Sequence, residues 1–256
     1  MNERKVKKLI YNYLEQYNTE YFQTPKIDSI KIINSHRTWG EFETKVLYQQ
    51  QRVLKIEPAL FDEKERFIKQ TLYHEFTHMY DSTKFLSFDE ETYMNIMQIY
   101  SEVHASEIEM DIILNAQDKD LNDYMNHELE RVENQFIMPN GIVPMDNTKF
   151  TYKIFYYFVG KLLSTYKHNL EYKYKFSDEL NIEFILLFKE IINYFMDNAE
   201  YDFLTLIDFQ HQMKNTILRN IKIHNNEVRI KAKMKELGLD EIPSDLYENL
   251  KNGIFD

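Results

Sequence analysis

The chain has 256 residues and a formal net charge of −11, from 42 acidic and 31 basic side chains. This charge would repel a polyanion, so nucleic-acid binding is not expected unless basic residues gather on one face. The absence of cysteine excludes disulfides and thiolate metal sites, and fits a cytoplasmic protein. The longest apolar run, 154–160, is too short to span a bilayer, and the first residues lack the features of a signal peptide, so membrane insertion is not expected.

The N-terminal part predicts one helix followed by a small sheet. Residues 2–22 carry apolar side chains at helical spacing, and Pro25 ends the helix. Alternation of apolar and polar residues then predicts three strands, at 27–33, 41–48 and 52–57.

The stretch 71–81 contains the pattern His-Glu-x-x-His. No Gly or Pro occurs between residues 62 and 84, and an apolar stripe runs along this predicted helix: Ile68, Leu72, Phe76 and Met79. His74 and His78 stack one turn apart on roughly the opposite side, where they could hold one metal ion with Glu75 beside it. The alternative interpretation is two surface histidines on an ordinary helix.

A catalytic zinc usually has three protein ligands and an open water position, so a third ligand must come from elsewhere. The next helical stretch, 90–115, carries Glu102, and a turn before it would bring this helix back alongside the first. The small Ala105 and Ser106 would allow a close approach of the two helices. Glu102 is therefore the favoured ligand. The alternatives on the same helix are His104, Glu107, Glu109 and Asp111.

These motifs resemble those of the mitochondrial inner-membrane-associated peptidases that process an ATP-synthase subunit. More loosely, they are similar to small gluzincin-like metallopeptidases of bacteria and phages, including those that cleave repressors of mobile elements. The resemblance covers roughly 53–111, and the mitochondrial setting does not carry over, because the cysteines of that family are absent here. The matching residues are His74-Glu75-Phe76-Thr77-His78-Met79-Tyr80-Asp81 and Ser101-Glu102-Val103-His104-Ala105.

The resemblance implies a zinc metallopeptidase that holds one zinc ion per chain. It implies His74, His78 and Glu102 as the metal ligands and Glu75 as the catalytic base. In such a mechanism Glu75 takes a proton from the water at the open zinc position and passes it to the leaving amine.

Several supporting roles stay open at the level of sequence. Asp81, one turn beyond His78, could orient a ligand imidazole, or it could act as a helix-end cap or ion pair. The donor that stabilises the oxyanion is open among Tyr80, Tyr100 and His104. In zincin-like folds an edge strand beside the active-site helix can pair with an extended substrate, and 51–57 is the candidate here; an ordinary structural strand is the alternative.

The second half of the chain predicts helices only. After a helix at 119–136, Pro and Gly residues at 139–144 suggest a boundary between a zincin-like metallopeptidase domain, 1–138, and a helical C-terminal domain, 145–256. Ser177 is a predicted N-cap, and Gly238 is predicted to end the last helix. The predicted helices of this half are 148–173, 177–198, 203–223 and 225–237.

The expected fold class is α+β, mostly helical, with a small sheet and an active-site helix followed by a helical bundle. The aromatic run 150–158 is either a bundle core or a substrate or partner surface, and the basic stretch 222–235 is either a solvated helix face or a basic patch. The favoured function is a zinc-dependent peptidase acting on an intracellular protein or peptide. The alternative is a noncatalytic metal-binding or chaperone-like module that works through the helical half. The oligomeric state stays open.

Overall fold

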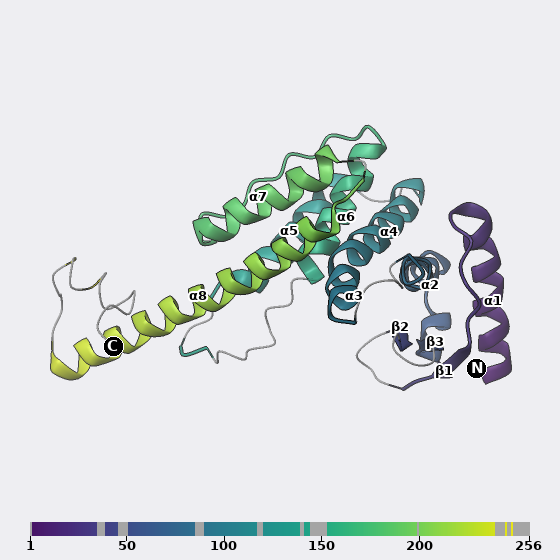
Figure 1. The fold of residues 1–256 in the computed structure, drawn as a ribbon, viewed down its shortest axis with the longest axis horizontal. Coiled ribbons are helices and arrows are strands. Elements are labelled where there is room, and N and C mark those ends of the chain that lie inside the picture. The colour runs from purple at the N-terminus through teal and green to yellow at the C-terminus, as the bar shows by residue number, and fades with distance from the viewer. Residues whose placement is uncertain are drawn as a thin grey trace.

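The computed structural model describes residues 2–34, 39–45, 51–84, 90–116, 120–138, 141–143, 153–198 and 200–238, with residues 244 and 247. The structure is mostly helical and includes one three-stranded sheet, which confirms the α+β class (Figure 1). Within the described residues, no helix is both long and apolar enough to cross a membrane.

The first helix, α1 (Glu3–Glu20), covers the outer side of the N-terminal part (Figure 1). The Asn2 side chain caps it by accepting a hydrogen bond from the Lys5 N–H at 2.9 Å, which satisfies one of the free amides of the first turn. The buried residues of α1 recur at helical spacing and face α2: Val6, Ile10, Leu14 and Tyr17.

The sheet has the order β1-β3-β2, so the last strand in sequence is the central one. Strand β3 (Gln51–Ile56) pairs in parallel with β1 (Ser29–Ile32) and antiparallel with β2 (Gly40–Lys45). Of the two roles open for 51–57, the edge strand is wrong, because both sides of β3 are already hydrogen-bonded, and the ordinary structural strand is confirmed. Strand β2 is the edge strand that contacts α2.

After a 3₁₀ turn, η1 (Pro58–Asp62), the chain forms α2 (Glu65–Asp81), which carries the His-Glu-x-x-His pattern. The predicted apolar stripe is confirmed, since its four residues are at most 6% exposed: Ile68, Leu72, Phe76 and Met79. This burial fixes the rotation of α2, and so it directs the opposite face toward the following helices.

The stretch predicted as one helix at 90–115 is interrupted. The chain forms α3 (Glu90–Ile96), then a π-helical turn, η2 (Met97–Ser101), and then α4 (Glu102–Ala116). A π turn holds more residues than an α turn, so it changes the rotation of every side chain that follows. Ser101, the last residue of this turn, and Glu102, the first residue of α4, both face α2.

The described part of the chain has four further helices: α5 (Leu121–Phe136), α6 (Lys153–Lys167), α7 (Ile182–Asp197) and α8 (Phe203–Leu237). The predicted N-cap Ser177 is wrong, because the Asn181 side chain caps α7 through the Glu183 N–H at 2.9 Å. The two helices predicted at 203–223 and 225–237 are one helix, which ends at Gly238 with φ +66°. The far half of α8 extends beyond the other helices (Figure 1).

Buried apolar side chains form two main clusters. The first core combines mainly α1, the sheet and α2 with Ile108 and Ile112 of α4. The second core combines mainly α5 to α8 with other residues of η2 and α4, among them Val103 and Met110. Helix α4 therefore lines both cores. The division into 1–138 and 145–256 stays a prediction, and residues 139, 140 and 144 of its boundary lie outside the described part.

Candidate metal centre

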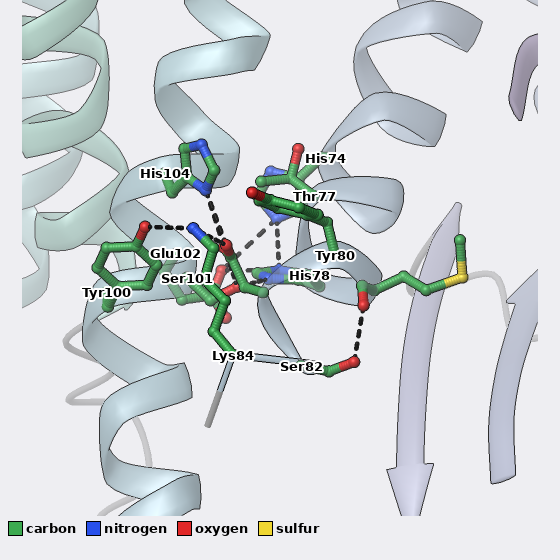
Figure 2. A network of polar contacts seen from close by, with 12 residues as sticks. His74, Thr77, His78, Tyr80, Ser82, Lys84, Tyr100, Ser101, Glu102 and His104 are labelled. Carbon is green, nitrogen blue, oxygen red and sulfur yellow. Dashed lines mark hydrogen bonds and ion pairs between the residues drawn. The ribbon is translucent and has the colours of Figure 1, made fainter. Parts of the chain in front are cut away.

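The His-Glu-x-x-His face of α2 and the first turn of α4 meet at one point (Figure 2). His74 Nε2 and His78 Nε2 lie 3.1 Å apart. Glu102 Oε2 lies 3.5 Å from the first and 3.3 Å from the second. These three ligand atoms all lie within 4.8 Å of one another, so the group could hold a metal ion.

The state of the Glu102 carboxylate supports this assignment. Its Oε1 accepts a hydrogen bond from Lys153 Nζ of α6, whereas its Oε2 is buried without a hydrogen-bond partner among the described residues. A buried carboxylate oxygen without a partner is costly. A cation placed between Oε2 and the two imidazoles would satisfy all three atoms, and two imidazoles with one carboxylate form a familiar ligand set for zinc.

The charges of the group favour the ligand form of Glu102. Burial by itself would raise the pKa of this carboxyl, but the adjacent His78 and His74 outweigh burial and hold it well below its usual range. Burial would likewise lower the pKa of His74, but the carboxylates of Glu102, Glu75 and Glu109 raise it above its usual value. Glu102 is therefore ionised, which is the form that binds a cation.

Glu75 is buried, with 8% of its surface exposed, and it lies beneath the edge strand β2. A Cβ atom added to Gly40 of β2 would come within 3.2 Å of Glu75 Cγ. The glycine thus allows the backbone of this strand to pass close to the predicted catalytic base.

Ser101 determines which nitrogen of His78 can bind a metal. The Ser101 hydroxyl donates to Asp81 Oδ2 at 3.0 Å. His78 Nδ1 lies 2.7 Å from the same hydroxyl oxygen (Figure 2). Because the only hydroxyl proton is used for Asp81, Nδ1 must carry the proton that the serine oxygen accepts. The lone pair of His78 then lies on Nε2, which faces Glu102.

Asp81 is fully buried and acts on His78 through Ser101 rather than by direct contact. It also lies 3.0 Å from His104 Nδ1 and 3.5 Å from Lys84 Nζ. Both roles left open for Asp81 fit this geometry: it reaches the His78 imidazole through one intermediate hydroxyl, and it forms an ion pair with Lys84.

The alternative third ligands have other partners. His104 is held by Asp81, Glu107 by Lys167 and Asp111 by Ser164. Glu109 faces Lys161 with one oxygen, and its Oε2 lies 3.8 Å from His74 Nδ1, on the side of the ring away from Glu102. It can therefore support His74 from behind, but it does not join the ligand group.

Helix α6 supplies residues that the sequence analysis did not identify. Lys153 holds Glu102, and the Tyr157 ring packs edge-on against His74 with ring centroids 5.6 Å apart. Further along, Lys161 is buried between Glu128 Oε2 at 2.8 Å and Glu109 Oε1 at 3.8 Å. The spacing of four residues was the available signal, because it places all three side chains on one face of a helix.

Helices α4 and α6 approach closely at Gly160. A Cβ atom added there would lie 2.1 Å from the Val103 carbonyl oxygen and 2.9 Å from Ser106 Cβ. Ser106 therefore faces α6, and its small size serves the approach of α4 to that helix. The close contact instead brings α6 to the metal-binding residues.

Comparison with known families matches residues 10–91 to the SprT-like family, a family of zinc-metallopeptidase-like proteins. The matched part runs from α1 to α3 and includes His74, Glu75 and His78, but it ends before Glu102. The match agrees with the resemblance to small gluzincin-like metallopeptidases. A search of curated proteins and a search of solved structures gave no match.

Proposed function

We propose, starting from the match of residues 10–91 to the SprT-like family, that this protein is a zinc-dependent peptidase that hydrolyses peptide bonds of a protein substrate. One observation carries the proposal: Glu102 Oε2, buried and without a hydrogen-bond partner among the described residues, faces the Nε2 atoms of His74 and His78.

His74, His78 and Glu102 would hold the zinc ion. When bound, zinc would polarise the scissile carbonyl and lower the pKa of a water molecule at its open position. Glu75, next to His74 in the sequence, would take the proton from the attacking water and later deliver it to the leaving amine. Lys153 would keep Glu102 Oε1 occupied, so that Oε2 alone is presented to the metal.

The first test is the zinc content of the purified full-length protein, compared with Glu102→Ala. We expect about one zinc per chain in the wild type and a clear loss in the variant, because the carboxylate completes the ligand set. The matched control is Glu107→Ala on the same helix, which removes a carboxylate bound to Lys167 and should leave zinc content unchanged. Wild-type protein that takes up no zinc, even when zinc is supplied, would contradict the proposal.

The second test concerns hydrolysis, with denatured casein as a general substrate. Chelation should abolish cleavage, added zinc should restore it, and Glu75→Gln should keep its zinc while losing turnover by on the order of 10²-fold or more. A zinc-loaded wild type that does not cleave casein or other unfolded proteins would favour the noncatalytic metal-binding or chaperone-like module.

A further inference from the structure

Two partly exposed aromatic rings lie in contact where the edge strand β2 begins. The Trp39 ring packs edge-on against the Phe67 ring, with centroids 5.7 Å apart, and the two side chains are 37% and 36% exposed. Trp39 immediately precedes β2, whereas Phe67 lies near the start of α2. A single exposed apolar side chain needs no explanation, but two that meet from separate segments form a small apolar surface, which we call the aromatic pair.

Both members of the aromatic pair are attached to backbone that is held in place. The Trp39 carbonyl oxygen accepts a hydrogen bond from the Glu57 N–H at 3.0 Å, and the next residue, Gly40, pairs with β3. Phe67 belongs to α2, where its neighbour Ile68 is buried in the first core. A ligand that contacts the two rings would therefore not have to order a loop first, which keeps the entropic cost of binding low.

The aromatic pair stands at one end of a row of side chains that leads to the predicted base. Phe67, Thr71 and Glu75 recur at intervals of four residues, so they form one ridge on α2. The start of β2 follows this ridge, because Trp39 meets Phe67 at one end. Toward the other end, a Cβ atom added to Gly40 would lie 3.3 Å from Thr71 Cγ2 and 3.2 Å from Glu75 Cγ. The pair, the glycine and the base thus follow one another along one boundary between strand and helix.

The length of this ridge determines which part of a substrate could reach the aromatic pair. Phe67 and Glu75 are two turns apart on α2, which is about 12 Å along the helix axis. An extended peptide covers about 3.3 Å per residue, so this distance corresponds to about three or four residues. A substrate with its scissile carbonyl at Glu75 would therefore present to the rings a side chain about three or four residues away.

The chemistry of the rings selects the class of side chain that they would bind. Covering their exposed carbon surface with another apolar group removes both surfaces from water, and an aromatic group adds an edge-to-face contact. Backbone pairing along an edge strand gives affinity with little sequence preference, so preference has to come from side-chain contacts such as these.

We propose that Trp39 and Phe67 select a large apolar side chain of the substrate, such as phenylalanine, leucine or methionine, about three or four residues from the bond that is cleaved. This inference rests on the peptidase function proposed above. It narrows the substrate class to extended segments of unfolded protein that carry such a residue, because a folded protein buries it.

The test maps cleavage sites by mass spectrometry in a peptide library made by digesting whole-cell protein at glutamate residues. Zinc-loaded full-length wild type should show large apolar residues enriched at one position, about three or four residues from the scissile bond. Phe67→Ala should keep its zinc and lose this enrichment. On one peptide with the preferred residue, KM of the variant should rise by about 10-fold with kcat little changed, because the contact is remote from the reacting atoms.

Trp39 is the single tryptophan of the chain, so its fluorescence reports on the aromatic pair without any cleavage. The same peptide is titrated into zinc-loaded Glu75→Gln, which should bind substrate without turnover. We expect the tryptophan emission to change on binding. A second peptide, with alanine at the preferred position, should bind about 10-fold more weakly.

The matched control is Tyr11→Ala, which removes another exposed aromatic ring, 49% exposed on α1. Helix α1 carries none of the proposed metal ligands, so this variant should keep the wild-type preference and KM. Phe67→Leu keeps an apolar side chain in the pair and should retain most of the preference. The two variants together separate the apolar contact at Phe67 from a general effect of losing a surface ring.

Three outcomes would overturn the inference. Cleavage by the wild type with no preferred position, or with charged residues enriched there, would do so and leave the peptidase proposal intact. An apolar preference that persists in Phe67→Ala would remove the aromatic pair from substrate selection. A zinc-loaded wild type that cleaves no peptide of the library would overturn the peptidase function, and the role of the aromatic pair with it.

Discussion

At the residue scale, the ability of the centre to bind a metal depends on which atoms carry single protons. Ser101 has one hydroxyl proton and two acidic or basic neighbours, and its donation to Asp81 determines the tautomer of His78. On the other side of the site, Glu109 lies behind His74 and is itself faced by the buried Lys161. Each imidazole thus has a carboxylate behind it, directly for His74 and through a hydroxyl for His78.

We expect Ser101→Ala to weaken zinc binding by about 10- to 100-fold, because His78 loses the group that holds its tautomer and ring orientation. Competition against a chelator of known zinc affinity would measure this change. Ser106→Ala is the control, since it removes a buried hydroxyl of the following helix, α4, one without a hydrogen-bond partner among the described residues. Equal zinc affinity in the two variants would contradict the role of Ser101.

The sequence predicts the central residues of this site because their relation is local. His74 and His78 share one face of one helix, and Glu102 stands at the start of the next long helix. Lys153 and Tyr157 could not be found in the same way, because they come from a distant segment and belong to a long aromatic run. The packing of α6 on α4 alone distinguishes Tyr157, which lies at the site, from the adjacent aromatic residues, which lie in the second core.

At the element scale, α4 stands between α2 and α6, and the contact with α6 depends on one glycine. Gly160 allows the two helix backbones to approach at Val103, and this approach carries Lys153 and Tyr157 to the site. Any side chain at position 160 would have to separate the helices or shift one along the other.

We expect Gly160→Ala to lower the free energy of unfolding by about 1–3 kcal/mol, measured by urea denaturation, although alanine is the better helix former. Its zinc affinity should fall as well, because α6 retreats from Glu102. Gly238→Ala is the control, because its added methyl group meets nothing within 4 Å. The positive φ at this position should lower the free energy of unfolding of the variant, but its zinc affinity should not change. Wild-type stability and zinc binding in Gly160→Ala would refute the close-contact explanation.

Two element boundaries could not be predicted, for different physical reasons. The π turn before α4 has no sequence signature by which it could be told from a continuous α-helix. The sequence predicts two helices where α8 is continuous, because the stretch around Asn225 is polar. This side chain is buried, and it exchanges two hydrogen bonds of 2.7 Å with the backbone of Val143, so its polarity serves a tertiary contact rather than a helix end.

At the scale of the whole molecule, the second core bears on the predicted division at 139–144. It includes apolar residues of α4 and α5, on one side of that division, and of α6 to α8 on the other. A fragment 1–138 would therefore expose side chains that are buried in the full chain, among them Met110, Met125 and Val132.

We expect the fragment 1–138 to bind a hydrophobic dye and to lack a cooperative urea transition, whereas the full chain unfolds cooperatively. Far-ultraviolet circular dichroism and dye fluorescence, recorded on both, would measure the difference. A sharp transition in the fragment, with dye binding no higher than that of the full chain, would instead favour two independent domains.

Because α4 contributes residues to both cores, metal binding at the site affects the stability of both. Glu102 begins the helix whose Ile108 and Ile112 belong to the first core and whose Val103 and Met110 belong to the second. A cation that fixes Glu102 therefore stabilises both cores together. At a free concentration one hundred times its dissociation constant, it adds about 2.7 kcal/mol to the free energy of unfolding. Loss of the metal would weaken the coupling between the two cores. A single melting transition of the chain could then separate into two, one for each core.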